Sequence, residues 1–263
     1  MTDQKLVLLE VEDGVATITL NRPQSRNVFD REQAQQLGST VEKAVADAGI
    51  RVVVLRGAGA AFCAGADLPT FVRNIDNPSP MVRDILGNIN QASHALRESG
   101  KLIVAGVHGV AAGVGLSLAI QSDFCIAADT TTLIPGYALI GLSPDGGATK
   151  AAVERLGVKR AIQLYLGEET LDARRGAELG LIDRIVPEAE LDRTTRDLAQ
   201  RLARNSADAI LHTKSLLRRA DCTPHPVQLQ AELEAIIDCM GTEFYRVALH
   251  KRIEATLRPR SNQ

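Results

Sequence analysis

Two short segments of this sequence combine glycine and alanine with the expected start of a helix. The first is "FCAGADL", Phe62 to Leu68, and the second is "GVAAGVGLSLA", Gly109 to Ala119. Each follows an apolar run that is typical of a strand. Small residues before a helix leave backbone N–H groups uncovered, and the helix dipole favours negative charge at that place. Two such N–H groups directed at one point would form an oxyanion hole.

Other kinds of site fit these segments less well. "GAGAAF" after "RVVVLR" begins like a dinucleotide-binding loop, but the third glycine is absent and Phe62 is too large for a close helix contact. A P-loop is excluded because no Gly-Lys-Ser/Thr sequence occurs. The four cysteines form no CxxC pair and no cluster with histidine, so we expect buried thiols, and neither a disulfide framework nor a metal site.

The composition is that of a globular protein. The chain has 263 residues, of which 45% are hydrophobic and 24% charged. A net charge of −2 and an aromatic content of 3% argue against nucleic acid as a partner. The apolar runs are far shorter than the roughly 18 to 20 residues of a membrane span, and the N-terminus does not resemble a signal peptide. These features predict no membrane association and a cytoplasmic location.

Strand and helix patterns alternate through the first part of the chain and place both segments at strand-to-helix junctions. The expected elements are a hairpin of residues 5–13 and 15–23 turning at Asp13-Gly14, a helix capped by Asp30 and ending near residue 48, a buried parallel strand at 51–57, a helix at 81–98, and strands at 102–109, 123–129 and 131–136. From about residue 148 helical spacing dominates. We therefore expect an α/β core over residues 1–200 and a helical C-terminal region over 201–263.

Several motifs in series carry a resemblance to a known family. "LNRPQSRN", "AFCAGADL", "GVAAGVGLSLAIQSDFCIAAD" and "IGLSPDGGATKAAVERLGVKRAIQLYLGEETLDARRGAELGLIDRIVP" resemble, in order and spacing, the crotonase family of enoyl-CoA hydratases and isomerases. The resemblance covers roughly residues 5–255. It implies a spiral of ββα units with a helical C-terminal trimerisation region, and a homotrimer or a dimer of trimers. It also implies an acyl-CoA substrate and no metal or separate cofactor, because coenzyme A is part of the substrate.

The resemblance also implies which residues form the site. The backbone N–H groups of Ala66 and Val114 correspond to the two donors of the family's oxyanion hole, with Val114 in place of the usual glycine. The expected substrate contacts are Arg26, Ala64, Asp67, Leu68, Gly113 and Tyr137.

The catalytic carboxylates of the hydratases are missing. Their two glutamates align with Ser117 and Tyr137, and a phenol with a pKa near 10 is poorly matched to base catalysis at neutral pH. Asp145 occupies the position at which certain isomerases of the family, among them the 1,2-epoxyphenylacetyl-CoA isomerases, place a catalytic aspartate. The resemblance therefore implies a double-bond isomerase in which Asp145 carries the proton.

Alternatives remain open at this stage. Asp145 lies in Pro-Asp-Gly-Gly before a helix expected at 147–156, a pattern typical of an aspartate that caps the helix. The chain could also be a hydratase with other acid and base groups, or an acyl-CoA binding protein without activity. The 4-chlorobenzoyl-CoA dehalogenases also use an aspartate at the Asp145 position. They need a histidine one helical turn before His94 and a tryptophan at position 137, and this chain has Asn90 and Tyr137.

Overall fold

The structure is a computed structural model that describes residues 5–168 and 170–257. The chain divides into two compact units, with the boundary between Ala203 and Arg204. The first unit holds both sheets and the predicted site residues, and the second consists of helices.

A six-stranded sheet forms the centre of the first unit, in the order β1-β2-β3-β4-β6-β9. Its strands are β1 (Val7–Glu12), β2 (Val15–Leu20), β3 (Val52–Gly57), β4 (Leu102–Val107), β6 (Phe124–Ala128) and β9 (Arg184–Val186). β1 and β2 are antiparallel, and the other neighbours are parallel. The predicted hairpin is confirmed. Asp13 and Gly14 have φ angles of 49° and 79°, the left-handed values that a tight hairpin turn requires.

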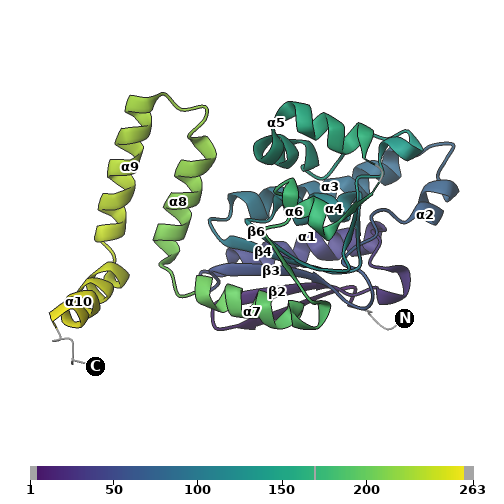
Figure 1. Cartoon of the computed structure of the whole chain (residues 1–263). Coiled ribbons are helices and arrows are strands. Elements are labelled where there is room, and N and C mark those ends of the chain that lie inside the picture. Colours follow the sequence, from purple (N-terminus) through teal and green to yellow (C-terminus); the bar gives the residue numbers. More distant parts are fainter. Residues whose placement is uncertain (1–4, 169, 258–263) are drawn as a thin grey trace. The chain divides into compact units, whose positions relative to one another are not determined.

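Helices cover both faces of this sheet (Figure 1). α1 (Arg31–Ala46) and α3 (Ser79–Glu98) pack on one face, and α7 (Leu191–Leu202) packs on the other. Successive side chains of β3 alternate between the two apolar clusters that result, because neighbouring strand residues point to opposite faces. Asp30 accepts a hydrogen bond from the Gln33 N–H at 2.9 Å and caps α1 as predicted, and the helix ends slightly earlier than expected.

A smaller three-stranded sheet lies beside the predicted site. It consists of β5 (Val110–Ala112), β7 (Thr132–Ile134) and β8 (Leu171–Asp172). The sequence analysis predicted no strand at the residues of β5, which is wrong. These three residues are extended because they pair with β7, and that pairing positions the glycines that follow.

Four further helices complete the first unit: α2 (Leu68–Arg73), α4 (Val114–Gln121), α5 (Ala148–Gly167) and α6 (Ala173–Glu178). Short 3-10 helices occur at Pro23–Ser25, Ala138–Ile140 and Glu188–Glu190. α5 is kinked at Gly157, whose φ of 73° and ψ of 162° interrupt the helix. The kink separates the first half of α5, which follows Asp145, from a second half that carries Tyr165.

The second unit contains three helices, α8 (Ala207–Arg219), α9 (His225–Met240) and α10 (Glu243–Leu257). None of the helices in the described ranges is long and apolar enough to cross a membrane. The expectation of four buried thiols is half wrong. Cys63 and Cys125 are buried in the first unit, whereas Cys222 is exposed in the turn after α8 and Cys239 is half-buried near the end of α9.

Candidate active site

The loop after β3 is held in an extended conformation by the segment that precedes α1. The Phe29 N–H donates to the Gly65 carbonyl at 2.8 Å, and the Asp67 N–H donates to the Phe29 carbonyl at 3.1 Å. These two bonds form a parallel bridge between Phe29 and Ala66. In such a bridge the N–H of the middle residue points away from the partner segment. The Ala66 N–H is therefore directed to the other side of the loop, as an oxyanion-hole donor must be.

Asn27 holds this loop in place through side-chain hydrogen bonds. Its side chain is fully buried, and its Nδ2 donates to the carbonyl groups of Ala58 and Ala61 at 2.9 and 2.8 Å. Its Oδ1 accepts from the Arg22 N–H at 2.8 Å. The Arg22 guanidinium in turn lies 2.9 Å from the Asp30 carboxylate. A buried amide with all these partners holds the two segments in one arrangement.

The second glycine-rich segment begins with β5 and ends at the first turn of α4. Gly113 has a φ of 49° and precedes the helix, and the Ser117 N–H donates to its carbonyl at 3.0 Å. Val114 is the first helical residue, so its N–H has no carbonyl to bond within the helix. The structure thus gives the Val114 N–H the position expected of an anion-binding donor at a helix N-terminus.

The two segments touch through glycines. A Cβ added at Gly65 would lie 3.0 Å from the Ala112 carbonyl oxygen, and one added at Gly115 would overlap the Cys63 carbonyl oxygen. Glycine is required where one backbone approaches another this closely. The loop of Ala66 and the first turn of α4 are therefore adjacent.

A chain of hydrogen bonds joins the three side chains that the sequence analysis singled out. The Tyr137 hydroxyl donates to Asp145 Oδ1 at 2.7 Å and lies 3.0 Å from Ser117 Oγ. Ser117 Oγ also lies 3.1 Å from the Gly113 carbonyl, so the chain reaches the start of α4. The structure therefore brings both positions of the hydratase glutamates and Asp145 into one cluster, in which Asp145 is the only carboxylate.

Burial shapes the chemistry of this cluster. It raises the pKa of the Asp145 carboxyl above its ordinary value, and the hydrogen bond from Tyr137 offsets part of the rise. Burial also raises the pKa of the Tyr137 hydroxyl, and the negative charge of Asp145 adds to this effect. Tyr137 therefore stays protonated as a donor, while Asp145 is poised to gain and lose a proton closer to neutral pH.

Asp145 does not cap α5 with its side chain, so that alternative is wrong. The residue before α5 is Gly147, no side chain caps the helix, and only the Asp145 carbonyl bonds to the first turn, through the Ala148 N–H at 3.0 Å. Left-handed φ angles at Gly146 and Gly147 turn the carboxylate toward Tyr137 instead. The Pro-Asp-Gly-Gly pattern is compatible with a helix cap and with a side chain turned toward the site. The hydrogen bond from Tyr137 shows that the carboxylate takes the second position.

Gln121, which the sequence analysis did not select, holds the Asp145 turn on α4. Its Nε2 donates to the Gly146 carbonyl at 2.6 Å and to the Ser117 carbonyl at 2.8 Å. Ser93 on α3 donates to its Oε1 at 2.5 Å. A glutamine at the end of a mostly apolar helix was the available signal in the sequence.

The expected substrate contacts fall into two neighbouring groups. Arg26, Ala64, Asp67 and Leu68 lie along the first loop, and Gly113 and Tyr137 lie beside the first turn of α4. Arg26 is exposed, and its carbonyl accepts from the Ala64 N–H at 2.9 Å. The Asp67 carboxylate accepts from the Thr70 N–H at 3.1 Å and caps α2, so its side chain already has a structural role.

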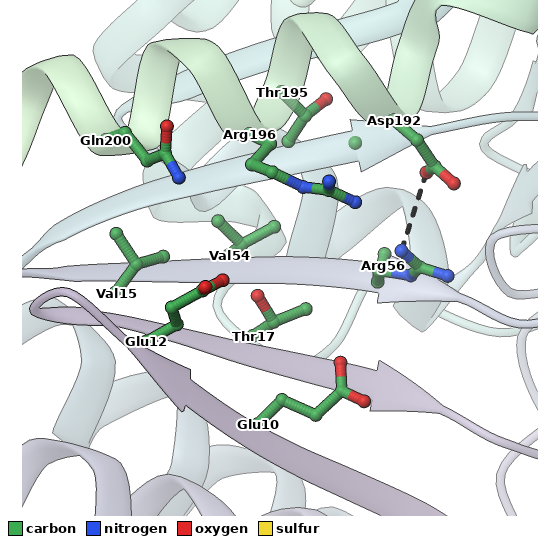
Figure 2. Close-up of a pocket in the computed structure, with 11 residues that line it drawn as sticks. Glu10, Glu12, Val15, Thr17, Val54, Arg56, Asp192, Thr195, Arg196 and Gln200 are labelled. Carbon is green, nitrogen blue, oxygen red and sulfur yellow. Dashed lines mark ion pairs between the residues drawn. The ribbon is translucent and has the colours of Figure 1, made fainter.

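A cavity of about 250 Å³ lies elsewhere, between the sheet and α7 (Figure 2). Charged groups line it, among them Glu10 and Glu12 from β1 and an Arg56–Asp192 ion pair of 3.6 Å. None of the predicted site residues borders this cavity, which is on the sheet face that α7 covers. The cluster around Asp145 is therefore the better candidate for chemistry.

Comparison with known proteins identifies the family. The family model of enoyl-CoA hydratase/isomerase matches residues 10–254. The chain belongs to the enoyl-CoA hydratase/isomerase family. It is 34% identical to 1,2-epoxyphenylacetyl-CoA isomerase of Escherichia coli K12 over 262 residues, which cover 98% of each chain. It is 31% identical to trans-2-decenoyl-[acyl-carrier-protein] isomerase of Streptococcus mutans, over 82% of each chain.

The fold agrees with this family. A solved structure from Thermobifida fusca YX, assigned as an enoyl-CoA hydratase and in complex with CoA, aligns with a TM-score of 0.80 and 30% identity, covering 90% of this chain and 93% of that one. The fold class expected from the sequence, a crotonase-like α/β core with a helical C-terminal region, is therefore confirmed. The family is shared by hydratases and isomerases, so the fold alone does not choose the reaction.

The contact at Gly115 gives a prediction about stability. Replacing Gly115 with alanine forces a methyl group into the Cys63 carbonyl, so we expect the free energy of unfolding to fall by about 1–3 kcal/mol, measured by urea denaturation. Gly87 on α3 is the matched control, because a Cβ there meets nothing within 4 Å. Gly87→Ala should be neutral or stabilise by up to about 1 kcal/mol. Equal stability of Gly115→Ala and the unchanged protein would contradict the close contact.

Proposed function

We propose that this protein shifts the double bond of an acyl-CoA thioester, with Asp145 as the group that carries the proton. The observation that supports this most is the Ser117–Tyr137–Asp145 chain, in which a single half-buried carboxylate lies beside the first turn of α4. Two relatives over most of the chain are named as isomerases. A double-bond shift needs one group that takes and returns a proton, and it needs no water.

The two backbone N–H groups supply the electrostatic part of the mechanism. In the proposal the thioester carbonyl oxygen lies between the N–H groups of Ala66 and Val114. Loss of a proton from C2 places negative charge on this oxygen, and fixed donors stabilise that charge without having to reorganise. Loss of one such donor typically costs about 2.7–4 kcal/mol of transition-state stabilisation.

The proton steps then balance on one residue. For a 3-enoyl thioester, the Asp145 carboxylate removes a proton from C2, and the electrons of that bond form a dienolate. The protonated Asp145 returns the proton to C4, which gives the conjugated 2-enoyl thioester and restores the carboxylate. Tyr137 holds Oδ1 of Asp145 at 2.7 Å, which leaves Oδ2 to face the substrate.

Contacts with coenzyme A are proposed along the first loop. Arg26 is exposed and could meet a phosphate group, and the backbone from Ala64 to Leu68 would contact the rest of the carrier. The Thermobifida fusca relative in complex with CoA supports coenzyme A as a ligand of this fold. We propose no further cofactor, because the thioester brings the coenzyme with it.

The alternatives fit the site less well. Water addition in the hydratase manner needs two carboxylates, and Ser117 and Tyr137 stand in those positions. Tyr137 cannot replace a carboxylate as base because burial and Asp145 raise its pKa. A binding protein without activity would have no use for a half-buried carboxylate that is positioned by Gln121 and Tyr137. A dehalogenase would need a histidine at position 90 and a tryptophan at position 137, and this chain has Asn90 and Tyr137 there.

Removal of the Asp145 carboxylate tests the proposed reaction. We expect Asp145→Asn to lower kcat by about 10²–10⁴-fold, because base catalysis of this kind contributes that much. The assay follows conversion of a 3-enoyl-CoA to its conjugated isomer by ultraviolet absorbance, with no change in mass. Asp129→Asn, in an exposed position after β6, is the control. A kcat for Asp145→Asn within threefold of the unchanged enzyme would exclude Asp145 as the proton carrier.

Tyr137 should set the pH dependence. Its hydrogen bond stabilises the Asp145 carboxylate, so Tyr137→Phe should raise the pKa of Asp145 further above its ordinary value. Asp145 must be deprotonated to act as base, and the acidic limb of the kcat/KM profile should therefore move to higher pH. Ser117→Ala removes a bond to Tyr137 and none to Asp145, so its shift should be smaller. An acidic limb that stays in place, or moves to lower pH, in Tyr137→Phe would refute this role.

We also propose that the second unit mediates self-association into a homotrimer or a dimer of trimers. Its helices expose many large apolar side chains, each 41–58% accessible: Val227, Leu229, Leu233, Ile236, Ile237 and Met240 on α9, and Phe244, Val247, Leu249 and Ile253 on α10. Exposed apolar surface of this kind marks an interaction site.

Light scattering measures this assembly directly. We expect a mass of about three or six times the 28.2 kDa chain, and a lower mass for the double variant Leu233→Glu/Ile237→Glu. Ionised side chains on that face would have to be desolvated in the interface. A monomer at micromolar concentration would contradict the proposal.

A further inference from the structure

Tyr165, on the second half of α5, has a buried hydroxyl for which the described residues provide no hydrogen-bond partner. The side chain is 8% exposed and belongs to the main apolar cluster of the first unit. Tyrosine hydroxyls that are buried usually have a partner, because an unpaired one loses its bonds to water without replacement. An unpaired hydroxyl in the core therefore calls for an explanation.

The position of Tyr165 suggests one. Its ring meets the ring of Tyr137 edge-on, with centroids 6.2 Å apart and planes at 62°. Tyr137 in turn bonds Asp145, so Tyr165 stands one aromatic ring away from the proposed proton carrier. Burial raises the pKa of the Tyr165 hydroxyl, and the negative charge of Asp145 adds to the rise, so the hydroxyl stays protonated as a donor.

The neighbouring polar groups do not satisfy this donor. The Tyr137 hydroxyl already donates to Asp145 and lies within hydrogen-bond distance of Ser117. Ser117 is fully buried on α4, where its hydroxyl reaches the Gly113 carbonyl. The Tyr165 hydroxyl is thus not part of the hydrogen-bond network that orients Asp145. It lies on α5, next to the ring of Tyr137.

We propose that the Tyr165 hydroxyl donates a hydrogen bond to an oxygen atom in the acyl group, beyond the carbons that exchange the proton. The substrate class would be acyl thioesters with an ether, epoxide, hydroxyl or carbonyl oxygen in the chain or ring, in preference to plain hydrocarbon chains. The inference rests on the proposed function insofar as it places the acyl group beside Asp145. A site that hydrogen-bonds a substrate group disfavours analogues that lack it, because the site's own polar group is then left unpaired.

Binding of unreactive analogues tests this contact separately from turnover. The probes are octanoyl-CoA and three analogues in which an ether oxygen replaces the methylene at the fifth, sixth or seventh carbon. Their Kd values are measured by calorimetry with the unchanged protein and with Tyr165→Phe, which removes only the hydroxyl. Tyr245→Phe on α10 is the matched control, since Tyr245 is the remaining tyrosine of the chain.

The readout is the ratio of the Kd of each ether analogue to the Kd of octanoyl-CoA. For at least one oxygen position we expect Tyr165→Phe to raise this ratio on the order of tenfold, as loss of a buried hydrogen bond would do, while Tyr245→Phe leaves it unchanged. Tyr165→Phe should leave the Kd of octanoyl-CoA itself within about twofold.

Two results would overturn the inference. The first is a ratio that stays the same at all three positions, which would mean that the hydroxyl does not contact the acyl group. The second is an equal loss of affinity for all four thioesters in Tyr165→Phe, which would assign Tyr165 to packing. Neither result depends on turnover, so failure of the isomerase proposal shows separately, as absent conversion of a 3-enoyl-CoA by a protein that still binds these analogues.

Discussion

The backbone of Cys63 lies against the first turn of α4, and this contact determines how the rest of the site is built. Only glycine at position 115 permits it, and Gly65 permits the matching approach to Ala112 from the other side. The contact brings together the segments that carry the backbone N–H groups of Ala66 and Val114, which come from separate strand-to-helix junctions. The pairing of β5 with β7 and the buried amide of Asn27 hold the two loops in place. Glycine weakens regular structure, and in the proposed mechanism that cost is offset because the close approach lets backbone N–H groups stabilise negative charge on the thioester oxygen.

A second constraint is the number of carboxylates. Within the cluster beside α4 the residues that align with the hydratase glutamates are a serine and a tyrosine, and both support Asp145 instead of competing with it. Burial favours the protonated form of Asp145, and the Tyr137 hydroxyl favours the charged form. A group balanced in this way can accept and return one proton, which is what a double-bond shift requires. Gln121 adds the rigidity, because it ties the Asp145 turn to the helix that carries Ser117.

Much of the fold could be predicted from the sequence, and the features that could not be predicted have physical reasons. Asp13-Gly14 forms a turn and Asp30 caps a helix through contacts with residues close by in the sequence. The hairpin and the start of α1 could therefore be predicted from these residue types. β5 could not, because three small residues between glycines become a strand only when β7 lies beside them. The sequence could not decide whether Asp145 caps α5, since the choice depends on Tyr137. The sequence analysis did not select Tyr165, because no sequence pattern shows that a buried hydroxyl lacks a hydrogen-bond partner. Only the packing of α5 against Tyr137 shows this.

The most direct test of the account is to trace the proton itself. A 3-enoyl-CoA carrying deuterium at C2 is converted by the enzyme in ordinary water, and the position of the label in the product is read by NMR and mass spectrometry. If one carboxylate carries the proton, the 2-enoyl product should hold a measurable share of the deuterium at C4. A product with no deuterium at C4, or one whose mass has increased by one water, would contradict the claim that Asp145 alone moves the proton between the two carbons.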